Sequence, residues 1–592
     1  MLWTLLLACK PDPVPFDSLA VFPSSELMDD GVVAIPADLL PVAVTPTPVE
    51  RLRHRDGFSV VQSTVFDLGV DIDPSSLPGP MDVDQAGSVQ IWDLDTGERL
   101  PAWAEVDAYP QDSEFPTLLV RPGSVLPLDH RVAVVVTDQV LDVDGSPLSA
   151  TDWWSAAEDQ VPLEGADSEH WHTLANELAE LGIQGIVAAT DFPIGDGTAP
   201  MRAMAEQVQT PSEYTLRKVR DSELGDSVQP QTWRLIEGSF ETDTWLLDDD
   251  ALVLDDQGLP VLQGTESADL MILVPESVRE AGSAKAVWIF GHGIFSGPDD
   301  YLDADGDPSG VVALADEAQV IVIGTRWRGL TRTDLPSAVA AGNDFGRIPQ
   351  VTDKLAQGVA NTLALLKLIT DTDLMDQEPL AGLWDGESLG YYGISLGGIQ
   401  GATFMALQDE VPYAVLHVGG SAWSTMLERS ANWTVFEELV LIDFPSAKDR
   451  QILYAVSQLY WDTADPAGYT EELAQRNTLW QYSIGDEQVP NMTTELLARG
   501  TGMIQIEPSV YAIAGLEQSS DEGLSSGVVQ FDPQVEIPDS GNRPSETSGA
   551  HNNPRLWTGT RLQTATYLDP ATPGLIQNFC GNAPCSQDNS GP

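Results

Sequence analysis

Basic residues are scarce in this chain, and lysine is the scarcest of the charged residues. The 592 residues include 28 lysines and arginines but 91 aspartates and glutamates, which gives a formal net charge of −63 at pH 7. An acidic surface of this size repels phosphate backbones and anionic lipid head groups, so nucleic acid is a poor partner. Proteins from salty surroundings often have such surfaces, because salt screens the repulsion among the carboxylates.

Long apolar runs are also missing, since no stretch approaches the ~18 uninterrupted apolar residues of a membrane-spanning helix. The first residues, M-L-W-T-L-L-L-A-C, form a short apolar run without a basic start. The run ends in Leu6-Leu7-Ala8-Cys9, which resembles the lipobox at which bacterial lipoproteins are cleaved and lipidated on cysteine. We therefore expect residues 1–9 to be a lipoprotein-type signal and Cys9 to carry a lipid anchor to the membrane. The alternative is an apolar terminus that arose by chance.

Cysteine is rare, because besides Cys9 the chain has only Cys580 and Cys585, in the tail segment N-F-C-G-N-A-P-C. So close a pair can form a small disulfide loop in an oxidising compartment. Two unpaired thiols would instead fit a cytosolic protein. Together with Cys9, the pair predicts export to the bacterial cell envelope, as an outer-membrane lipoprotein, or to the extracellular space.

The chain is longer than the roughly 250–300 residues that one hydrophobic core usually serves, so two domains are expected. Residues 10–30 are rich in Pro, Ser and Asp without periodicity, which predicts a flexible tether. In residues 31–210, short β-like runs such as Val89–Trp92 and Arg131–Thr137 alternate with turn signals. We expect these residues to form an all-β, sandwich-like amino-terminal domain.

Residues 211–592 have a different pattern, in which buried strand-like runs alternate with helical patterns. Apolar residues at spacings of three or four from Val351 to Leu366 predict an amphipathic helix. The pattern predicts a catalytic domain with a mostly parallel, doubly wound sheet. The expected strands are Leu270–Val274, Ala286–Phe290, Val320–Ile323, Gly390–Gly393, Tyr413–Val418 and Leu479–Ile484.

The pattern G-x-S-x-G, typical of serine hydrolases, occurs twice, at residues 393–397 and 523–527. A short buried strand precedes Ser395 and a helix rich in small residues follows it, as in a nucleophile elbow. Ser525 instead follows the polar run E-Q-S-S-D-E, and no clear helix comes after it. The sequence therefore predicts Ser395 as the catalytic nucleophile.

A serine nucleophile needs a histidine base, which in this fold follows the nucleophile and the acid along the chain. Only His417 and His551 follow Ser395. His417 lies inside an expected strand, where a core histidine hydrogen-bonded to backbone is the better interpretation. His551 lies in the polar loop S-G-A-H-N-N-P-R ahead of a helical stretch, so it is the predicted base.

The acid is expected at a strand end between the serine and the histidine. The strand Leu479–Ile484 runs into G-D-E-Q-V-P, which places Asp486 at that end. Asp486 is the predicted acid, with Glu487 and Asp465 as alternatives. The alternating carboxylates of residues 303–307 lack the later glutamate of an EF-hand, so we expect a solvated loop there, with no metal and no cofactor.

Several of these segments resemble large extracellular bacterial lipases of the virulence-factor type, which join an amino-terminal β domain to an α/β-hydrolase domain. The residues that carry the resemblance lie in Thr117–Asp138 and in the segments F-G-H-G-I-F, V-I-G-T-R-W-R-G-L-T-R-T-D, Y-G-I-S-L-G-G and G-D-E-Q-V-P-N. The resemblance implies a serine carboxylic-ester hydrolase that acts through an acyl-enzyme on a Ser-His-Asp triad. By the same match, the amides of Ile294 and Leu396 would form the oxyanion hole.

The expected substrate is a small-molecule or lipid ester. A hydrophobic set beyond the elbow favours neutral esters of short to medium acyl chain: Trp423, Met426, Trp433, Phe436 and Leu439. One alternative is a serine peptidase or amidase on the same fold, although the β-rich half shows none of the blade repeats of a propeller. Another is a non-catalytic surface binding protein, which the presence of a complete triad disfavours.

Overall fold

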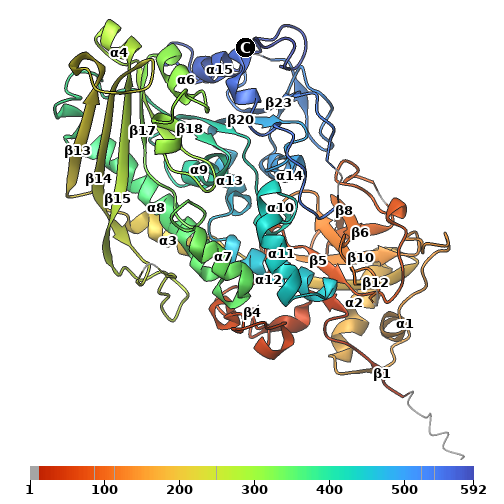
Figure 1. Ribbon diagram of the computed structural model, residues 1–592. Helices are drawn as coiled ribbons and strands as arrows, with labels where there is room; N and C mark the ends of the chain where they lie inside the picture. The colour runs from red at the N-terminus through yellow and green to blue at the C-terminus, as the bar shows by residue number, and fades with distance from the viewer. Residues whose placement is uncertain are drawn as a thin grey trace, which may run out of the picture.

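The computed structural model describes residues 12–85, 87–111, 114–248, 250–521, 523–538 and 541–591, so the predicted signal and Cys9 lie outside it. Its largest element is an 11-stranded mixed sheet in the carboxyl-terminal region, residues 211–591 (Figure 1). The strand order is β13-β14-β15-β17-β16-β18-β19-β20-β23-β21-β22. Strands from β13 to β17 pair antiparallel, and all later pairs are parallel.

The six strands expected from the sequence all occur in this sheet, with ends shifted by one or two residues except for a longer β15. Their bounds are β15 (Gly264–Pro275), β16 (Ala286–Gly291), β17 (Val320–Gly324), β18 (Leu389–Ile394), β19 (Tyr413–His417) and β20 (Asn477–Ser483). The remaining strands are β13 (Tyr214–Asp221), β14 (Thr232–Thr244), β21 (Gln505–Ile506), β22 (Gln518–Ser519) and β23 (Gly527–Phe531).

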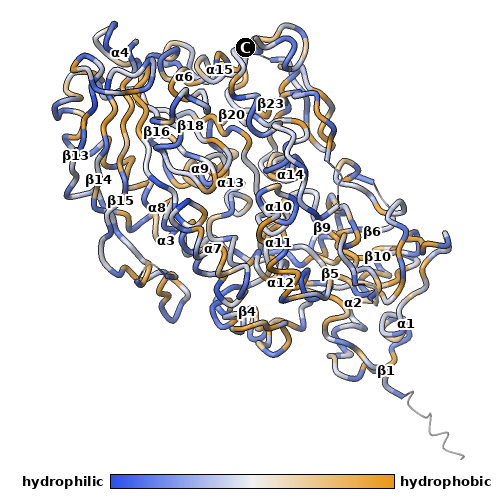
Figure 2. The backbone as a smooth tube through the Cα atoms, in the orientation of Figure 1, coloured by the Kyte–Doolittle hydropathy of each residue, from blue (hydrophilic) through white to orange (hydrophobic). Residues whose placement is uncertain are grey.

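Helices cover both faces of the central strands, which is why those strands are buried along almost their whole length and why β16 and β17 are mostly hydrophobic (Figure 2). Successive side chains of β16 point to opposite faces. Val287 and Ile289 pack with α8 (Pro349–Asp371) and α9 (Leu396–Ala406). Trp288 and Phe290 pack with α6 (Val311–Ala318) and α15 (Thr558–Tyr567). The result is the mostly parallel sheet with helices on both sides that the sequence predicted.

The amino-terminal region, residues 12–210, contains two four-stranded antiparallel sheets, with strand orders β12-β10-β6-β7 and β2-β5-β9-β8. Their strands are β2 (Val21–Phe22), β5 (Thr64–Phe66), β6 (Val89–Asp93), β7 (Glu98–Leu100), β8 (Ala102–Val106), β9 (Leu118–Pro122), β10 (Arg131–Thr137) and β12 (Ile186–Pro193). The expectation of an all-β region was wrong, because helices α1 (Asp152–Glu158), α2 (Ser168–Glu180) and α3 (Ala199–Gln207) also belong to it. The first two bury tryptophan side chains in its core.

The expected tether at residues 10–30 also requires correction, because from residue 12 onward it is packed into the amino-terminal region. Strand β1 (Val14–Pro15) pairs with β11 (Leu163–Glu164), and β2 pairs with β5. The β2 side chains are buried. An apolar pair of this length is too short to show periodicity, so no sequence pattern predicts this strand.

The two regions share one continuous hydrophobic core. Helix α3 packs against α8, and β5 packs against α12 (Ala447–Trp461). Helices α10 (Trp423–Leu427), α11 (Thr434–Asp443) and α12 lie between the large sheet and the amino-terminal sheets (Figure 1). Within the described residues, no helix combines the length and apolar character that crossing a membrane requires.

Candidate active site

Ser395 occupies a sharp turn between a strand and a helix. Strand β18 ends at Ile394 and α9 begins at Leu396, which leaves Ser395 alone between them with φ 58° and ψ −116°. A non-glycine residue at positive φ is strained, and such strain persists where the surrounding structure holds it. The turn also needs its two glycines, because a Cβ on Gly393 would overlap the Gly397 carbonyl and one on Gly397 would overlap Gly291.

The predicted residues gather at one edge of the sheet. Ser395 directly follows β18, and Asp486 follows β20 after a short turn. Only β19 separates these two strands in the sheet. Since the strands are parallel, their carboxyl ends meet at the same edge, where this class of sheet binds ligands.

His551 and Asp486 form a buried pair at this edge. His551 is 2% exposed and Asp486 is 3% exposed. The imidazole Nδ1 lies 2.9 and 2.8 Å from the two carboxylate oxygens. Oδ1 also accepts the amides of Gln488 at 2.8 Å and Val489 at 2.9 Å, which fixes the carboxylate. This arrangement places the proton on Nδ1 and leaves Nε2 free to accept one.

The two alternative acids have other roles. Glu487 is 0% exposed and accepts hydrogen bonds from the Ser548 hydroxyl and from the amides of Gly549 and His551, so it shapes the histidine loop. Asp465 is also buried, and its carboxylate accepts the amides of Ala467 and Trp423. Burial raises the pKa of the Asp465 carboxyl to about 6. Neither carboxylate is the one that faces the imidazole of His551.

The loop after β16 supplies the other side of the site. The Trp327 amide donates to Nε2 of His292 at 3.0 Å, so Nδ1 donates to the Gly293 carbonyl at 2.8 Å. Burial lowers the pKa of His292 to about 4, so the ring is neutral. A Cβ on Gly293 would lie 3.6 Å from that of Ser395, so the loop closely approaches the nucleophile.

The amides of Ile294 and Leu396, the predicted oxyanion donors, are available. Neither has a hydrogen-bond acceptor within the part of the chain that the structure describes. The Leu396 amide is the first of α9, where helix amides lack an intrahelical partner and the helix dipole favours negative charge.

Two further contacts concern the Ser395 hydroxyl and His417. The Ser395 hydroxyl has no hydrogen bond to His551 among the described residues, and contacts of this kind often tighten only when substrate binds. His417 is a core histidine as expected, but its partner is the Gln481 side chain at 3.0 Å rather than backbone. Burial lowers the pKa of His417 to about 3. The carbonyl of His417 accepts the Ser395 amide at 2.9 Å, so this residue supports the turn.

Ser395 opens into a small pocket whose walls include Ile294, Trp423, Met426, Leu427 and Asn432. Three of these residues, Ile294, Leu427 and Asn432, also line a second, strongly apolar cavity. That cavity lies among α8, α11 and α7 (Leu335–Asn343). An apolar space therefore continues from the nucleophile into the helical layer.

Aromatic side chains shape this apolar cavity. Trp433 and Phe436 line it and stack with ring centroids 5.3 Å apart. Phe295, from the loop after β16, stacks on Phe436 at 6.1 Å. Of the hydrophobic set expected at the site, Leu439 does not line either pocket and Val440 lines the cavity instead. The register of α11 decides this, because adjacent helical residues point in different directions.

Cys580 and Cys585 form a disulfide. The acidic segment 303–307 is occupied by protein contacts, since Asp303 pairs with Arg220 and Asp307 accepts amides of α6. Among the described residues, one group has side chains close enough to hold a metal ion, formed by Asp93, Asp95 and His130 in the amino-terminal region. No local sequence pattern predicts this group, because it joins two turns that are distant in the chain.

No protein-family model and no curated protein matches the chain. Several solved structures are similar to it at low identity. Acetyl xylan esterase 1 from Thermoanaerobacterium sp. JW/SL YS485 is 14% identical over 58% of this chain and 88% of that one, with a TM-score of 0.31. An acetyl xylan esterase from Paenibacillus sp. R4 is 12% identical over 64% and 94%, with a TM-score of 0.33. A Pyrococcus horikoshii acylaminoacyl peptidase is 14% identical over 59% of this chain and 49% of its own length, with a TM-score of 0.31.

Proposed function

We propose that this protein is a serine hydrolase of the α/β-hydrolase fold that cleaves carboxylic esters. Ser395 is the nucleophile, His551 the general base and Asp486 the acid that orients it. The observation that carries the proposal is the buried His551–Asp486 pair at the sheet edge where Ser395 occupies its strained turn. The order of the three residues along the chain is the order that this fold uses.

The proposed reaction has two halves. His551 Nε2 takes the proton of the Ser395 hydroxyl as Oγ attacks the ester carbonyl carbon, and the amides of Ile294 and Leu396 stabilise the oxyanion. Collapse of this intermediate breaks the bond to the alcohol, which leaves with the proton from His551. Water, deprotonated by His551, then attacks the acyl-enzyme, and the carboxylic acid leaves as Ser395 regains its proton.

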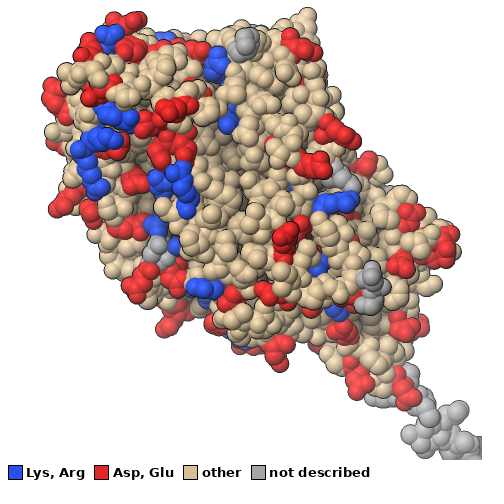
Figure 3. All heavy atoms as spheres, in the orientation of Figure 1, with Lys and Arg blue, Asp and Glu red and all other residues tan. Residues whose placement is uncertain are grey.

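The apolar cavity beside Ser395 favours neutral acyl groups of short to medium length. Its walls contain no acidic or basic side chain, so nothing there would bind a charged substituent. Figure 3 shows acidic side chains spread over the visible face, which disfavours acidic substrates. A small-molecule or lipid ester is therefore the proposed substrate, and the large extracellular bacterial lipases of the virulence-factor type are the proposed family.

Export is a separate proposal that rests on the sequence. The signal at residues 1–9 and the lipid anchor on Cys9 would place the protein at the bacterial cell envelope. A disulfide between Cys580 and Cys585 supports an oxidising compartment, where such bonds persist.

A fluorophosphonate probe tests the function directly. We expect it to label Ser395 alone, and Ser395→Ala should abolish labelling and lower ester turnover by several orders of magnitude. Ser525→Ala is the matched control and should keep both the labelling of Ser395 and the ester turnover. Nitrophenyl esters from acetate to palmitate, measured against matched anilides, then separate the alternatives. Anilides cleaved as fast as esters would indicate a peptidase, and an unlabelled wild type that cleaves neither would indicate a binding protein.

A further inference from the structure

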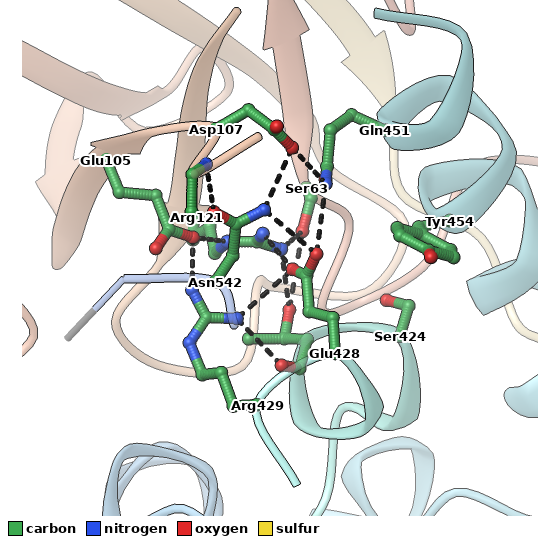
Figure 4. Close-up of polar contacts among 12 residues, drawn as sticks. Ser63, Glu105, Asp107, Arg121, Ser424, Glu428, Arg429, Gln451, Tyr454 and Asn542 are labelled. Atoms are coloured by element: carbon green, nitrogen blue, oxygen red, sulfur yellow. Dashed lines mark hydrogen bonds and ion pairs between the residues drawn. The ribbon is translucent and has the colours of Figure 1, made fainter. Parts of the chain in front are cut away.

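A buried arginine of the amino-terminal region contacts a helix whose other residues line the candidate active site. Arg121, on β9, is 2% exposed and lies at the centre of a polar cluster (Figure 4). Its Nε donates to Glu105 at 2.6 Å, and Nη1 donates to Ser63 at 2.9 Å and to Thr425 at 3.0 Å. Its Nη2 pairs with Glu428. Arg121 thus connects the amino-terminal sheet with residues in and just after α10.

Glu428 is the point at which several donors meet. One of its oxygens accepts from Arg121 and from Arg429, and the other accepts from Gln451 at 2.9 Å and Asn542 at 3.1 Å. The same two amides also donate to Asp107. The cluster contains three cations and three anions, so the charges balance: Arg121, Arg429, Arg450, Glu105, Asp107 and Glu428.

This cluster is a costly way to stabilise an interface. Desolvating so many charges usually makes a buried ion network no better than apolar residues of similar volume. Two of its atoms, Oε2 of Glu105 and Nε of Arg429, are buried without a hydrogen-bond partner among the described residues. What such a network does supply is one defined arrangement, because any sliding of the two surfaces would separate charges in a poorly polarisable interior.

The element that the cluster holds is α10. Trp423, Met426 and Leu427 of this helix line the pocket at Ser395, whereas Thr425 and the following Glu428 contact the cluster. A helix of five residues does not persist on its own, so its contacts decide its position. Its pocket face is apolar and would tolerate small displacements, whereas its polar contacts would not.

The cluster also contacts the segment that precedes the His551 loop. Asn542 accepts the Ala108 amide at 2.8 Å, and the Ser545 amide donates to the Arg429 carbonyl at 3.1 Å. These contacts anchor the segment that continues to the loop of His551.

We propose that Arg121 is a positioning residue of the active site, which acts through Thr425 and Glu428 to set the place of α10 and thereby the acyl groups that the pocket accepts. The amino-terminal region is then part of the specificity machinery. This inference rests on the proposed ester hydrolysis.

The test compares acyl selectivity in Arg121→Met and Arg121→Lys with the wild type. For Arg121→Met we expect KM for the preferred acyl ester to rise by about tenfold and the dependence of kcat/KM on chain length to flatten, since small pocket changes are worth that much. Labelling by a small fluorophosphonate should change by less than about threefold, because the triad and oxyanion amides remain. Arg121→Lys keeps the positive charge but lacks the planar guanidinium group that bonds several partners at once. Its KM and its chain-length profile should therefore lie between those of the wild type and of Arg121→Met.

Arg51→Met is the matched control. Arg51 pairs with Asp353 of α8 at 2.5 Å, so this change also breaks an ion pair between the two regions, but it does not touch α10. It should lower the melting temperature while leaving the chain-length profile unchanged.

An unchanged profile in folded Arg121→Met, or an equal shift in Arg51→Met, would overturn the proposal. If Arg121→Met does not fold, Thr425→Val removes one contact between Arg121 and α10 while every charge stays paired. Thr425→Val should then shift the chain-length profile in the same direction by a smaller factor. If neither Thr425→Val nor Arg121→Lys shifts this profile, the proposal is overturned as well. A wild type that neither reacts with the probe nor cleaves esters would instead refute the proposed function.

Discussion

The two G-x-S-x-G turns of this protein share a sequence pattern and differ in everything around it. The turn at Ser395 follows a strand and opens a helix, whereas the turn at Ser525 precedes strand β23. Because β18 and β23 run parallel in one sheet, a residue after the first and a residue before the second lie at opposite edges. The pattern therefore identifies a tight turn, and the neighbouring elements decide whether its serine can be a nucleophile.

The hydroxyl groups differ in the same way. Ser395 is 5% exposed and faces a pocket, and its hydroxyl has no hydrogen-bond partner among the described residues. Ser525 donates to Asn477 at 2.8 Å, and its carbonyl accepts the Tyr567 hydroxyl at 2.7 Å. One serine is available for chemistry, and the other closes a loop.

The largest expected effect is the loss of ester turnover when His551 or Asp486, the partners that only the turn at Ser395 has, is changed. His551→Ala and Asp486→Asn should each lower ester turnover by roughly 10⁴-fold or more, because the first removes the base and the second removes the carboxylate that holds the base in the tautomer able to accept the Ser395 proton. The double variant should lose little more than the worse single variant, since the residues act as a unit. Steady-state kinetics with a nitrophenyl ester measures this, and circular dichroism checks the fold. If the loss in the double variant instead equals the product of the two single losses, one of the two residues acts outside the triad. The turns at Ser395 and Ser525 would then differ less than we infer.

The next effect is on stability and compares the first glycine of each turn. A methyl group on Gly393 would overlap the Gly397 carbonyl, which is backbone that cannot move aside. On Gly523 it would meet only the end of the Asp521 side chain, at 3.1 Å. We expect Gly393→Ala to lower the free energy of unfolding by about 3 kcal/mol or more and Gly523→Ala to change it by less than about 0.5 kcal/mol. Urea unfolding measures both values, and similar losses at the two positions would show that the turns are equally constrained.

The smallest effect separates the roles of the two serines. Ser525→Ala removes the hydrogen bond to Asn477 and should cost about 0.5–1.5 kcal/mol of stability, with ester turnover unchanged. Ser395→Ala should leave stability within about 0.5 kcal/mol of the wild type, because its hydroxyl has no partner among the described residues to lose. Urea unfolding and ester assays on both variants check this. A stability loss from Ser395→Ala equal to that from Ser525→Ala would contradict the contrast.

Local patterns in the sequence were enough to predict six of the eleven strands of the large sheet and to select the candidate triad residues. Strands and the long helix follow from hydrophobic periodicity, which depends only on neighbouring residues. Asp486 could be chosen because the runs before it predicted a strand end, and His551 because few histidines follow Ser395. The short apolar pair in β2 and helices α1 and α3 of the amino-terminal region show where such patterns become too brief or too weak to interpret.

What the tertiary structure alone decided are contacts between distant parts of the chain. Arg121 and Glu428 are 307 residues apart, and no local pattern pairs them. In a chain with 91 acidic residues, many carboxylates could accept any given arginine, and only the packing of β9 against the segment after α10 selects one. The sequence by itself determined which residues could carry the chemistry, because strand, turn and helix signals are local. The shape of the pocket and the elements that hold its wall depend on long-range packing, which the order of residues along the chain does not reveal.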